Sequence, residues 1–567
     1  MATKATKAKN STQTKKTKKV IKPKKDTKTE MPTKAKQEAK PIKEKKAKKA
    51  KKEKPLTLEA IMWNCRNALR GTIGGNEKNR DAVMGLVFLK FAGDKFEKRR
   101  NEIKAQYGDK PVFLDKVSFY RAKSVYYIDE KARWSYIVTN ASNDKIAVIL
   151  DKAMADIEDK NEPLKGALPQ NFYASLGTRK EQIKGLIDEI NKIDESHFID
   201  KDLIGRVYEY FLQVFAIDAG QGEKGEFYTP AGIVKLIAEL IEPYNGIVYD
   251  PCCGSGGMFV QSIKFVERHN GNSSKISVVG QESNPDTWRL AKMNLAIRGI
   301  AHNLGDRATS TFTDDRHKDI KVQYIMANPP FNLAKWRGED ELTNDFRFHG
   351  YNTPPVSNAN YAWILHIVSK LDVTNGVAGF LLANGALSAD GIEGTIRRKL
   401  IENDKIEAII VLPREMFYST DISVTLWIIN NNKKARTLNE RQLIDRQGKI
   451  LFVDLRRWNN NVYDKKYVQF SDEQIANVKK IYNNWQTGKG YKDIPELCKS
   501  ATLEEIIKQN YSLAPSKYIE FIDHDLKIDY EKEMKRIQNE MKLLLDEEKK
   551  SQEMLEKAFE GIGYGIG

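Results

Sequence analysis

The chain has few cysteines and no long apolar run among its 567 residues. The four cysteines (Cys65, Cys252, Cys253 and Cys498) form no CxxC pair, and no histidine cluster accompanies them. This excludes a zinc site of the usual spacing, so we expect no metal and free thiols. No eighteen-residue apolar stretch and no apolar signal segment occurs. We therefore expect no membrane association and a cytoplasmic location.

The net charge of +17 resides entirely in residues 1–55. This segment contains 22 lysines, no arginine and five acids, and the rest of the chain has 72 basic and 72 acidic residues. A segment with so few large apolar side chains cannot bury enough surface to order itself, so we expect disorder. It is either a nonspecific polyanion-binding arm or a solubilising tail. The charge-balanced remainder predicts that a partner supplies much of the affinity for any DNA.

The periodicity of apolar residues changes along the rest of the chain. Residues 56–216 show helical spacing and are interpreted as a mostly helical packing domain. Residues 217–515 contain short apolar runs separated by helical stretches, together with peripheral additions. The apolar runs are GIVYD, SVVGQE, YIMANPP, GVAGFLLA, IEAIIVLP and TLWIINN. Continuous apolar strands alternating with helices predict a doubly wound α/β domain, a parallel sheet covered on both faces.

Residues 516–567 form a C-terminal helix and tail. A heptad seam runs along this charge-rich segment: Tyr530, Met534, Ile537, Met541 and Leu544. Such a helix packs either on its own domain or on another subunit, and we favour the second interpretation.

A glycine-rich turn follows the first predicted strand of the α/β domain, in IVYDPCCGSGGMFV. Glycines allow close approach to the backbone, and the start of the following helix offers N–H groups to an anion. The spacing fits neither a dinucleotide nor a triphosphate motif. Asp250 before the turn can hold an ammonium group while the turn holds a carboxylate. An amino acid carries both charges, as does the methionine end of S-adenosylmethionine.

Two further motifs end the next apolar strands. Glu282, in VVGQESNPDT, can accept hydrogen bonds from both ribose hydroxyls, although it could instead be a charge at a helix N-terminus. In YIMANPPFN, Pro329 and Pro330 remove two backbone donors and fix the chain as it leaves the sheet. The Asn328 side chain and the Pro329 carbonyl can then accept both hydrogens of an exocyclic amine. Phe331 offers a flat face to a purine, unless this is only a proline turn with a core phenylalanine.

These motifs resemble the amino-methyltransferases of DNA, whose signature is Asn-Pro-Pro-Tyr or Asn-Pro-Pro-Phe, and their order matches the adenine-N6 class. LTLEAIMWNCRNALRG, NANYAWILHI, GFLLANGALS, FYSTDI and the C-terminal helix also look like type I modification subunits. The resemblance runs from about residue 56 to the end. It implies a Rossmann-like S-adenosylmethionine-dependent methyltransferase domain. The catalytic residues it indicates are Asn328, Pro329, Pro330 and Phe331. The cofactor-binding residues are Glu226, Phe227, Tyr228, Thr229, Asp250, Cys252, Gly254, Ser255, Gly256, Gly257 and Glu282.

The resemblance also implies partners. The substrate would be an adenine flipped out of duplex DNA, and a separate specificity subunit would read the sequence. A second copy of the chain normally completes that complex, and a restriction motor subunit can join it. The C-terminal helix is the candidate docking element. The alternatives are an autonomous adenine methyltransferase, an enzyme that modifies RNA or a protein glutamine, and a scaffold subunit with a silent site.

Two positions within the resemblance stay open. The family often has an acid where this chain has Ser310, and Asp306, Asp314 and Asp315 lie close by in the sequence. A second aromatic residue packs on the target base in such enzymes. Phe417 is favoured over Tyr418 for this position, although both could be core residues.

Overall fold

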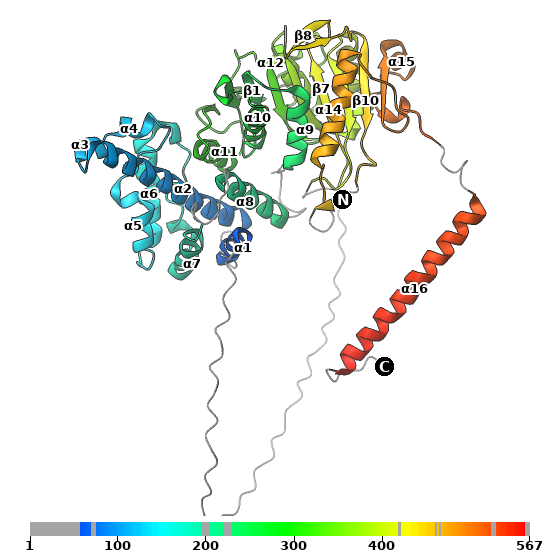
Figure 1. The fold of residues 1–567 in the computed structure, drawn as a ribbon. Coiled ribbons are helices and arrows are strands. Elements are labelled where there is room, and N and C mark those ends of the chain that lie inside the picture. The colour runs from blue at the N-terminus through cyan, green and yellow to red at the C-terminus, as the bar shows by residue number, and fades with distance from the viewer. Residues whose placement is uncertain are drawn as a thin grey trace, which may run out of the picture. The chain divides into compact units, whose positions relative to one another are not determined.

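The computed structural model describes most of the chain beyond the lysine-rich segment (Figure 1). The residues described are 57–69, 75–193, 203–219, 229–417, 421–459, 462–463, 467–522 and 529–561. The predictions for residues 1–55 and for Tyr418 lie outside them. None of the described helices combines the length and apolar character needed to span a bilayer.

Nine strands of the described chain form one sheet in the order β13-β10-β6-β7-β5-β4-β1-β2-β3. Two small antiparallel pairs flank this sheet, β8 (Arg436–Leu438) with β9 (Arg441–Leu443) and β11 (Val462–Tyr463) with β12 (Tyr467–Val468). The sheet strands are β1 (Gly246–Asp250), β2 (Ile276–Gly280), β3 (His302–Asn303), β4 (Tyr324–Ala327), β5 (Val377–Ala383), β6 (Ile406–Val411), β7 (Val424–Asn430), β10 (Lys449–Asp454) and β13 (Cys498–Thr502).

The predicted fold class is confirmed, with one correction to the direction of a strand. Strands β3, β2, β1, β4 and β5 run parallel, and β6 runs parallel to β10. The apolar run TLWIINN, expected in a parallel sheet, forms β7, which pairs antiparallel with both β5 and β6. The described part of the connection from β6 to β7 (residues 412–423) contains no helix, and the chain returns in the opposite direction. Strand β10 and the antiparallel β13 extend the sheet beyond the expected strands.

Helices cover both faces of the sheet, each over its own apolar core. One face packs against α9 (Ala231–Ile241), α10 (Gly257–Arg268), α11 (Pro285–Ile297) and α14 (Asp472–Thr487). The other face packs against α12 (Asn360–Lys370), α13 (Gly391–Glu402) and α15 (Leu503–Lys508). Alternation along β7 sends Ile428 to the first core and Trp427 to the second. Each such fully buried side chain contributes about 1.5–3 kcal/mol.

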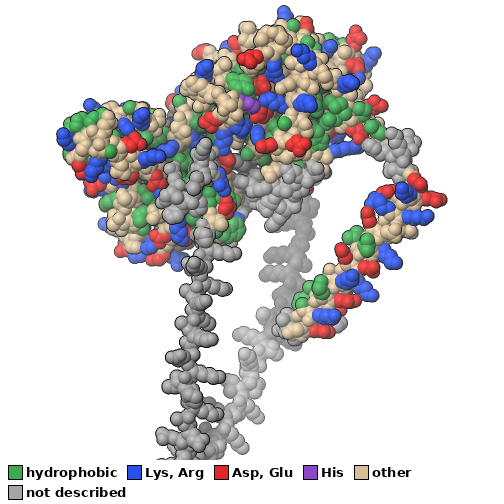
Figure 2. All heavy atoms as spheres, in the orientation of Figure 1, with side chains coloured by type: hydrophobic (Ala, Val, Ile, Leu, Met, Phe, Trp, Pro, Cys, Tyr) green, Lys and Arg blue, Asp and Glu red, His purple; other side chains and the backbone are tan. Residues whose placement is uncertain are grey.

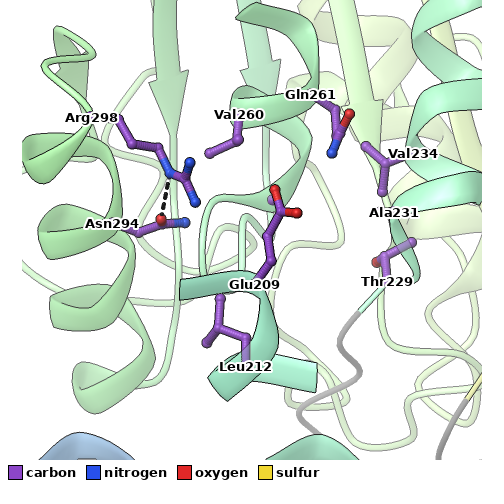
Figure 3. A pocket seen from close by; sticks show the side chains of 10 residues that line it. Glu209, Leu212, Thr229, Ala231, Val234, Val260, Gln261, Asn294 and Arg298 are labelled. Atoms are coloured by element: carbon purple, nitrogen blue, oxygen red, sulfur yellow. Dashed lines mark hydrogen bonds between the residues drawn. The ribbon is translucent and has the colours of Figure 1, made fainter. Parts of the chain in front are cut away.

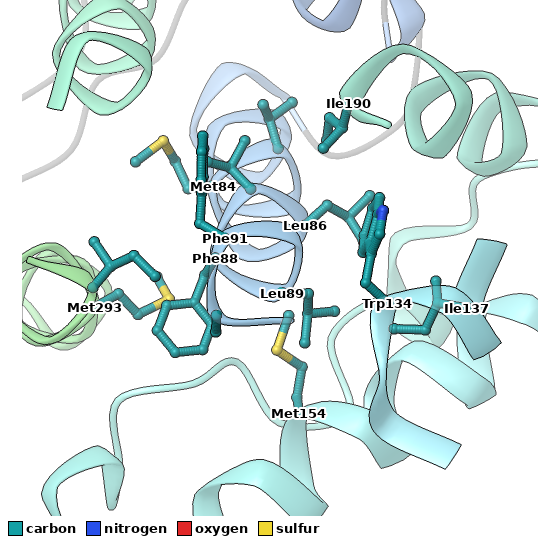
Figure 4. Packing of buried hydrophobic residues seen from close by; sticks show 14 of the residues in the cluster. Met84, Leu86, Phe88, Leu89, Phe91, Trp134, Ile137, Met154, Ile190 and Met293 are labelled. Atoms are coloured by element: carbon teal, nitrogen blue, oxygen red, sulfur yellow. The ribbon is translucent and has the colours of Figure 1, made fainter. Parts of the chain in front are cut away.

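The helical region packs directly on the α/β part through α11. Its elements include α1 (Leu58–Ala68), α2 (Gly75–Tyr107), α3 (Pro111–Leu114), α4 (Val117–Arg121), α5 (Trp134–Thr139), α6 (Ile146–Lys160), α7 (Lys180–Ile190) and α8 (Leu203–Ala219). Met293 of α11 belongs to the same apolar cluster as Phe88 of α2 (Figure 4). Lys95 donates to the Ile297 carbonyl at 2.8 Å, and Tyr126 donates to that of Ala296 at 3.2 Å. The opposite side of α11 faces the sheet, so one helix connects both cores.

The long helix α16 (Tyr530–Gly561) has no buried residue. The predicted seam lies on it, and Met541 and Leu544 are 61% and 65% exposed. Figure 2 shows apolar side chains along this helix between charged ones. Within the described chain, therefore, nothing covers its apolar seam.

Candidate functional site

The parallel pairing of three neighbouring strands brings the predicted motifs to one edge of the sheet. Asp250 ends β1 and lies in register with Gly280, the last residue of β2. Tyr249 of β1 pairs with Ile325 of β4. Glu282 follows β2 and Asn328 follows β4, so both leave the sheet beside Asp250. Ligands bind at this carboxyl edge in open α/β sheets.

The glycine-rich turn after β1 is held by backbone bonds while its outer side stays open. The N–H of Cys253 donates to the Gln281 carbonyl at 2.9 Å, and the N–H of Gly256 donates to the Cys253 carbonyl at 2.8 Å. Gly254 has φ +52°, and a Cβ built there would meet no atom within 4 Å. Helix α10 begins at Gly257, so its first N–H groups lie at the end of this turn. The turn thus offers space and donors to an anionic group.

The Asp250 carboxyl is buried beneath the turn. It is 1% exposed and accepts a 3.0 Å hydrogen bond from the N–H of Cys252. Among the described side chains, no cation pairs with it. Burial, aided by the Glu282 carboxylate, raises the pKa of Asp250 to about 7, against the opposing effect of the Cys252 bonds. The site therefore lacks the positive charge that would stabilise ionised Asp250.

The Glu282 carboxylate is fixed at the end of β2 by backbone donors. One oxygen accepts from the N–H of Gly254 at 3.0 Å. The other accepts from the N–H groups of Ser283 at 2.7 Å and Asn284 at 2.8 Å. The contact with Gly254 joins Glu282 to the glycine-rich turn.

Asn328 presents an unsatisfied acceptor to the site. Its Nδ2 donates to Thr229 Oγ1 at 2.9 Å, which holds the amide from one end. Its Oδ1 is buried and has no hydrogen-bond partner in the described chain. The Pro329 carbonyl likewise accepts no hydrogen bond from the described residues. A buried acceptor without a partner costs about 1–3 kcal/mol, so Asn328 Oδ1 indicates a place for a donor that arrives with a ligand.

Phe331 follows this pair and is half-buried. Its ring meets that of Phe417 edge to face, with centroids 6.2 Å apart and planes at 85°. Phe417 is 1% exposed and belongs to the core under the sheet. In this structure Phe417 supports the Phe331 ring as a core residue.

The structure describes some of the remaining predicted residues and not others. Cys252, Ser255 and Gly256 lie in the turn and Thr229 precedes α9, whereas Glu226, Phe227 and Tyr228 lie outside the described residues. The Ser310 hydroxyl accepts from the Phe312 N–H at 3.3 Å. The nearby acids are engaged in ion pairs: Asp306 with Arg316, Asp314 with Arg307 and Arg316, and Asp315 with Lys370.

Three buried polar residues that the sequence patterns missed hold the loops of the site. Gln281 donates to the carbonyls of Thr309 at 3.1 Å and Asp314 at 2.8 Å. Arg347 donates to the carbonyls of Thr311 at 3.0 Å and Phe312 at 2.6 Å. Asn294 of α11 donates to the Ser255 carbonyl at 2.8 Å. Isolated polar residues of this kind carry no periodic signal in a sequence, since their partners are distant along the chain.

A pocket lined by both apolar and polar residues adjoins the start of α10 (Figure 3). Arg298 points toward it and is oriented by a 3.0 Å hydrogen bond from its Nε to Asn294 Oδ1. The pocket is lined by Glu209, Leu212, Thr229, Ala231, Val234, Gly257, Val260, Gln261, Asn294 and Arg298.

In the part of the chain that the structure describes, no group of three His, Cys, Asp and Glu side chains could hold a metal ion.

Comparison with known proteins finds two family models along the chain. The model described as N-6 DNA Methylase matches residues 199–525, and that described as HsdM N-terminal domain matches residues 58–193. The methylase subunit of the type I restriction enzyme MjaIX from Methanocaldococcus jannaschii is 33% identical, over 89% of this chain and 91% of its own length. The methylase subunit of the type I restriction enzyme HindI from Haemophilus influenzae is 38% identical, over 74% of this chain and 93% of its own.

A solved structure shares the fold. The methyltransferase subunit of a type I restriction–modification system from Streptococcus thermophilus superposes with a TM-score of 0.65 at 23% identity, covering 81% of this chain and 98% of that one.

The raised pKa of Asp250 predicts a pH-dependent stability of the unliganded protein. A carboxyl whose pKa is higher in the folded chain than in the unfolded chain adds stability at low pH, and this stability is lost as pH rises through about 7. We expect the free energy of unfolding to fall more steeply between pH 5 and 7, by up to about 1.4 kcal/mol per pH unit, in the wild type than in Asp250→Asn, and the two slopes to converge above about pH 7. Denaturant titrations at several pH values measure this difference, and parallel pH profiles would contradict it.

Proposed function

This chain belongs to the N-6 DNA methylase family as the modification subunit of a type I restriction–modification system, and we propose that it transfers a methyl group from S-adenosylmethionine to N6 of adenine in DNA. The observation that carries the proposal is the buried, unsatisfied acceptor Asn328 Oδ1, which Thr229 holds beside the glycine-rich turn and which the Pro329 carbonyl follows in the chain. Two acceptors match the two N–H donors of an exocyclic amine.

The residues around the turn fit S-adenosylmethionine. The methionine ammonium would supply the cation that the buried Asp250 lacks, and the open turn from Gly254 to Gly257 would receive the carboxylate. Glu282 lies at the end of the next strand, where an acid accepts hydrogen bonds from ribose hydroxyls. When bound, this cofactor supplies a methyl group already activated by its sulfonium, so the contribution of the chain is mainly positioning.

The target adenine must leave the base stack, because its N6 is inaccessible inside the duplex. Asn328 Oδ1 and the Pro329 carbonyl then hold both amine hydrogens. This arrangement draws the nitrogen lone pair out of conjugation with the ring and leaves it free to react. Phe331 stacks on the purine, and Thr229 keeps the Asn328 amide from turning. Pro330 fixes the backbone between these groups.

Sequence recognition is assigned to a separate specificity subunit. Outside residues 1–55 the basic and acidic residues balance, so this part of the chain has no excess charge for strong unaided binding to DNA. The uncovered seam of α16 supplies a surface for docking. We propose a complex of two copies of this chain with one specificity subunit, of the kind that a restriction motor subunit joins.

Replacing Asn328 by Ala removes one amine acceptor without touching the turn that holds the cofactor. We expect N6-adenine methylation by the assembled complex to fall at least about 100-fold, as for loss of a preorganised polar group at a reacting centre. Cofactor affinity, measured by calorimetry, should change little. The matched control is Asn375→Ala, an exposed asparagine between α12 and β5. An Asn328→Ala complex as active as this control would refute the assignment.

Charges placed in the α16 seam should prevent assembly. Met541→Lys with Leu544→Lys changes two exposed side chains, so the fold should be unaffected while docking of an apolar partner is lost. Asp546→Lys is the control, because 100° per residue places Asp546 on the opposite side of the helix. Co-purification with the specificity subunit measures docking, and cofactor binding reports the integrity of the site. Normal assembly of the double variant would exclude the seam as the docking surface.

A further inference from the structure

The residue after the Asn-Pro-Pro-Phe motif has an unusual backbone conformation. Asn332 has φ +54°, in the left-handed region that costs most side chains about 1–2 kcal/mol. Asparagine tolerates this region better than most residues, but the conformation persists only where the surroundings hold it. Since Phe331 immediately precedes Asn332, the turn at Asn332 helps to set the direction of the Phe331 ring.

A buried asparagine on another element holds Asn332 at two points. Asn360 Oδ1 accepts from the N–H of Asn332 at 3.0 Å, and Asn360 Nδ2 donates to Asn332 Oδ1 at 2.8 Å. Because a backbone N–H can only donate, the first bond fixes which end of the Asn360 amide is the oxygen. The second bond then places the two amides in complementary orientation. Asn360 is 1% exposed and is the first residue of α12.

The surrounding chain makes this contact rigid. The N–H of Ala359 donates to the Leu333 carbonyl at 2.9 Å, and the N–H of Lys335 donates to the Val356 carbonyl at 2.8 Å. Helix α12 is anchored in the core beneath the sheet by several apolar side chains, including Ile364. The core therefore sets the position of Asn360, and the hydrogen bonds of its amide hold the loop at Asn332 in a fixed place.

We propose that Asn360 is a positioning residue for methyl transfer: through Asn332 it fixes the Phe331 ring at the angle needed to stack on the flipped adenine. This inference rests on the proposed function. Phe417 supports the Phe331 ring at its edge, and Asn360 fixes the backbone that carries it. The NANY segment (358–361), which the sequence motifs left without a role, thereby gains one.

The test compares single-turnover methylation by Asn360→Ala, Asn360→Asp and the Asn375→Ala control. Each full-length chain is assembled with its specificity subunit and given labelled S-adenosylmethionine and genomic DNA that lacks adenine methylation. We expect Asn360→Ala to lower the methylation rate about 10- to 100-fold, as for a small misplacement of a positioning group. Its cofactor dissociation constant should stay within about twofold of the control, because the turn is untouched. Asn360→Asp keeps an acceptor for the Asn332 N–H but places a second acceptor opposite Asn332 Oδ1, so it should restore only part of the rate.

A double-mutant cycle tests whether Asn360 acts through Asn332. Asn332→Gly adopts the left-handed backbone readily and keeps its N–H, so we expect a smaller loss of methylation rate than for Asn360→Ala. In the Asn360→Ala background it should add little further loss, because both changes remove the bond from Asn360 Nδ2 to Asn332 Oδ1, and the bond from Asn358 Nδ2 to the same oxygen is long, at 3.3 Å. If Asn360→Ala proves too unstable to assemble, Asn332→Gly alone decides, with a reduced rate at unchanged cofactor affinity as the expected result.

Three results would overturn the proposal. They are an Asn360→Ala rate equal to that of the control, a loss of cofactor affinity as large as the loss of rate, and independent effects of the two substitutions. A wild-type complex that places no label in adenine would instead contradict the proposed function itself.

Discussion

The parallel pairing of β1 between β2 and β4 is the constraint on which the rest of the site depends. It places the ends of three strands at one edge, so that Asp250, Glu282 and Asn328 leave the sheet as neighbours. Helices on both faces fix those strands, and α11 joins the helical region to the same framework. A shift of register on either side of β1 would separate the groups proposed to bind the cofactor from those proposed to bind the amine.

The site contains two electrostatic deficits that ligands of the proposed kind would correct. Among the described residues, Asp250 is a buried carboxyl without a paired cation, and Asn328 Oδ1 is a buried acceptor without a donor. An ammonium group satisfies the first and an exocyclic amine the second. Folding maintains both deficits because the surrounding core supplies far more stability than they cost. In the proposed function, cofactor and base thus bind to groups that are already in place.

Local sequence signals predicted much of this arrangement. Continuous apolar runs indicated the strands that carry the three motifs. Residue types indicated the turn at Gly254 and the candidate acceptor Asn328. Long-range contacts were not accessible in the same way. The antiparallel direction of β7 appears only in its pairing with β5 and β6, and the bond from Asn328 to Thr229 joins residues far apart in the chain. The roles of Gln281, Arg347 and Asn360 arise only from tertiary contacts, since a single buried polar residue has no periodicity.

The most direct test of the account follows the methyl group. The purified chain is incubated with labelled S-adenosylmethionine and genomic DNA that lacks adenine methylation, with and without its specificity subunit, and the label is sought in N6-methyladenine. We predict label in N6-methyladenine only when the specificity subunit is present. Label with the chain alone would preserve the adenine chemistry but contradict the dependence on a partner. No label in adenine from the complete complex, with cofactor bound, would contradict the central claim.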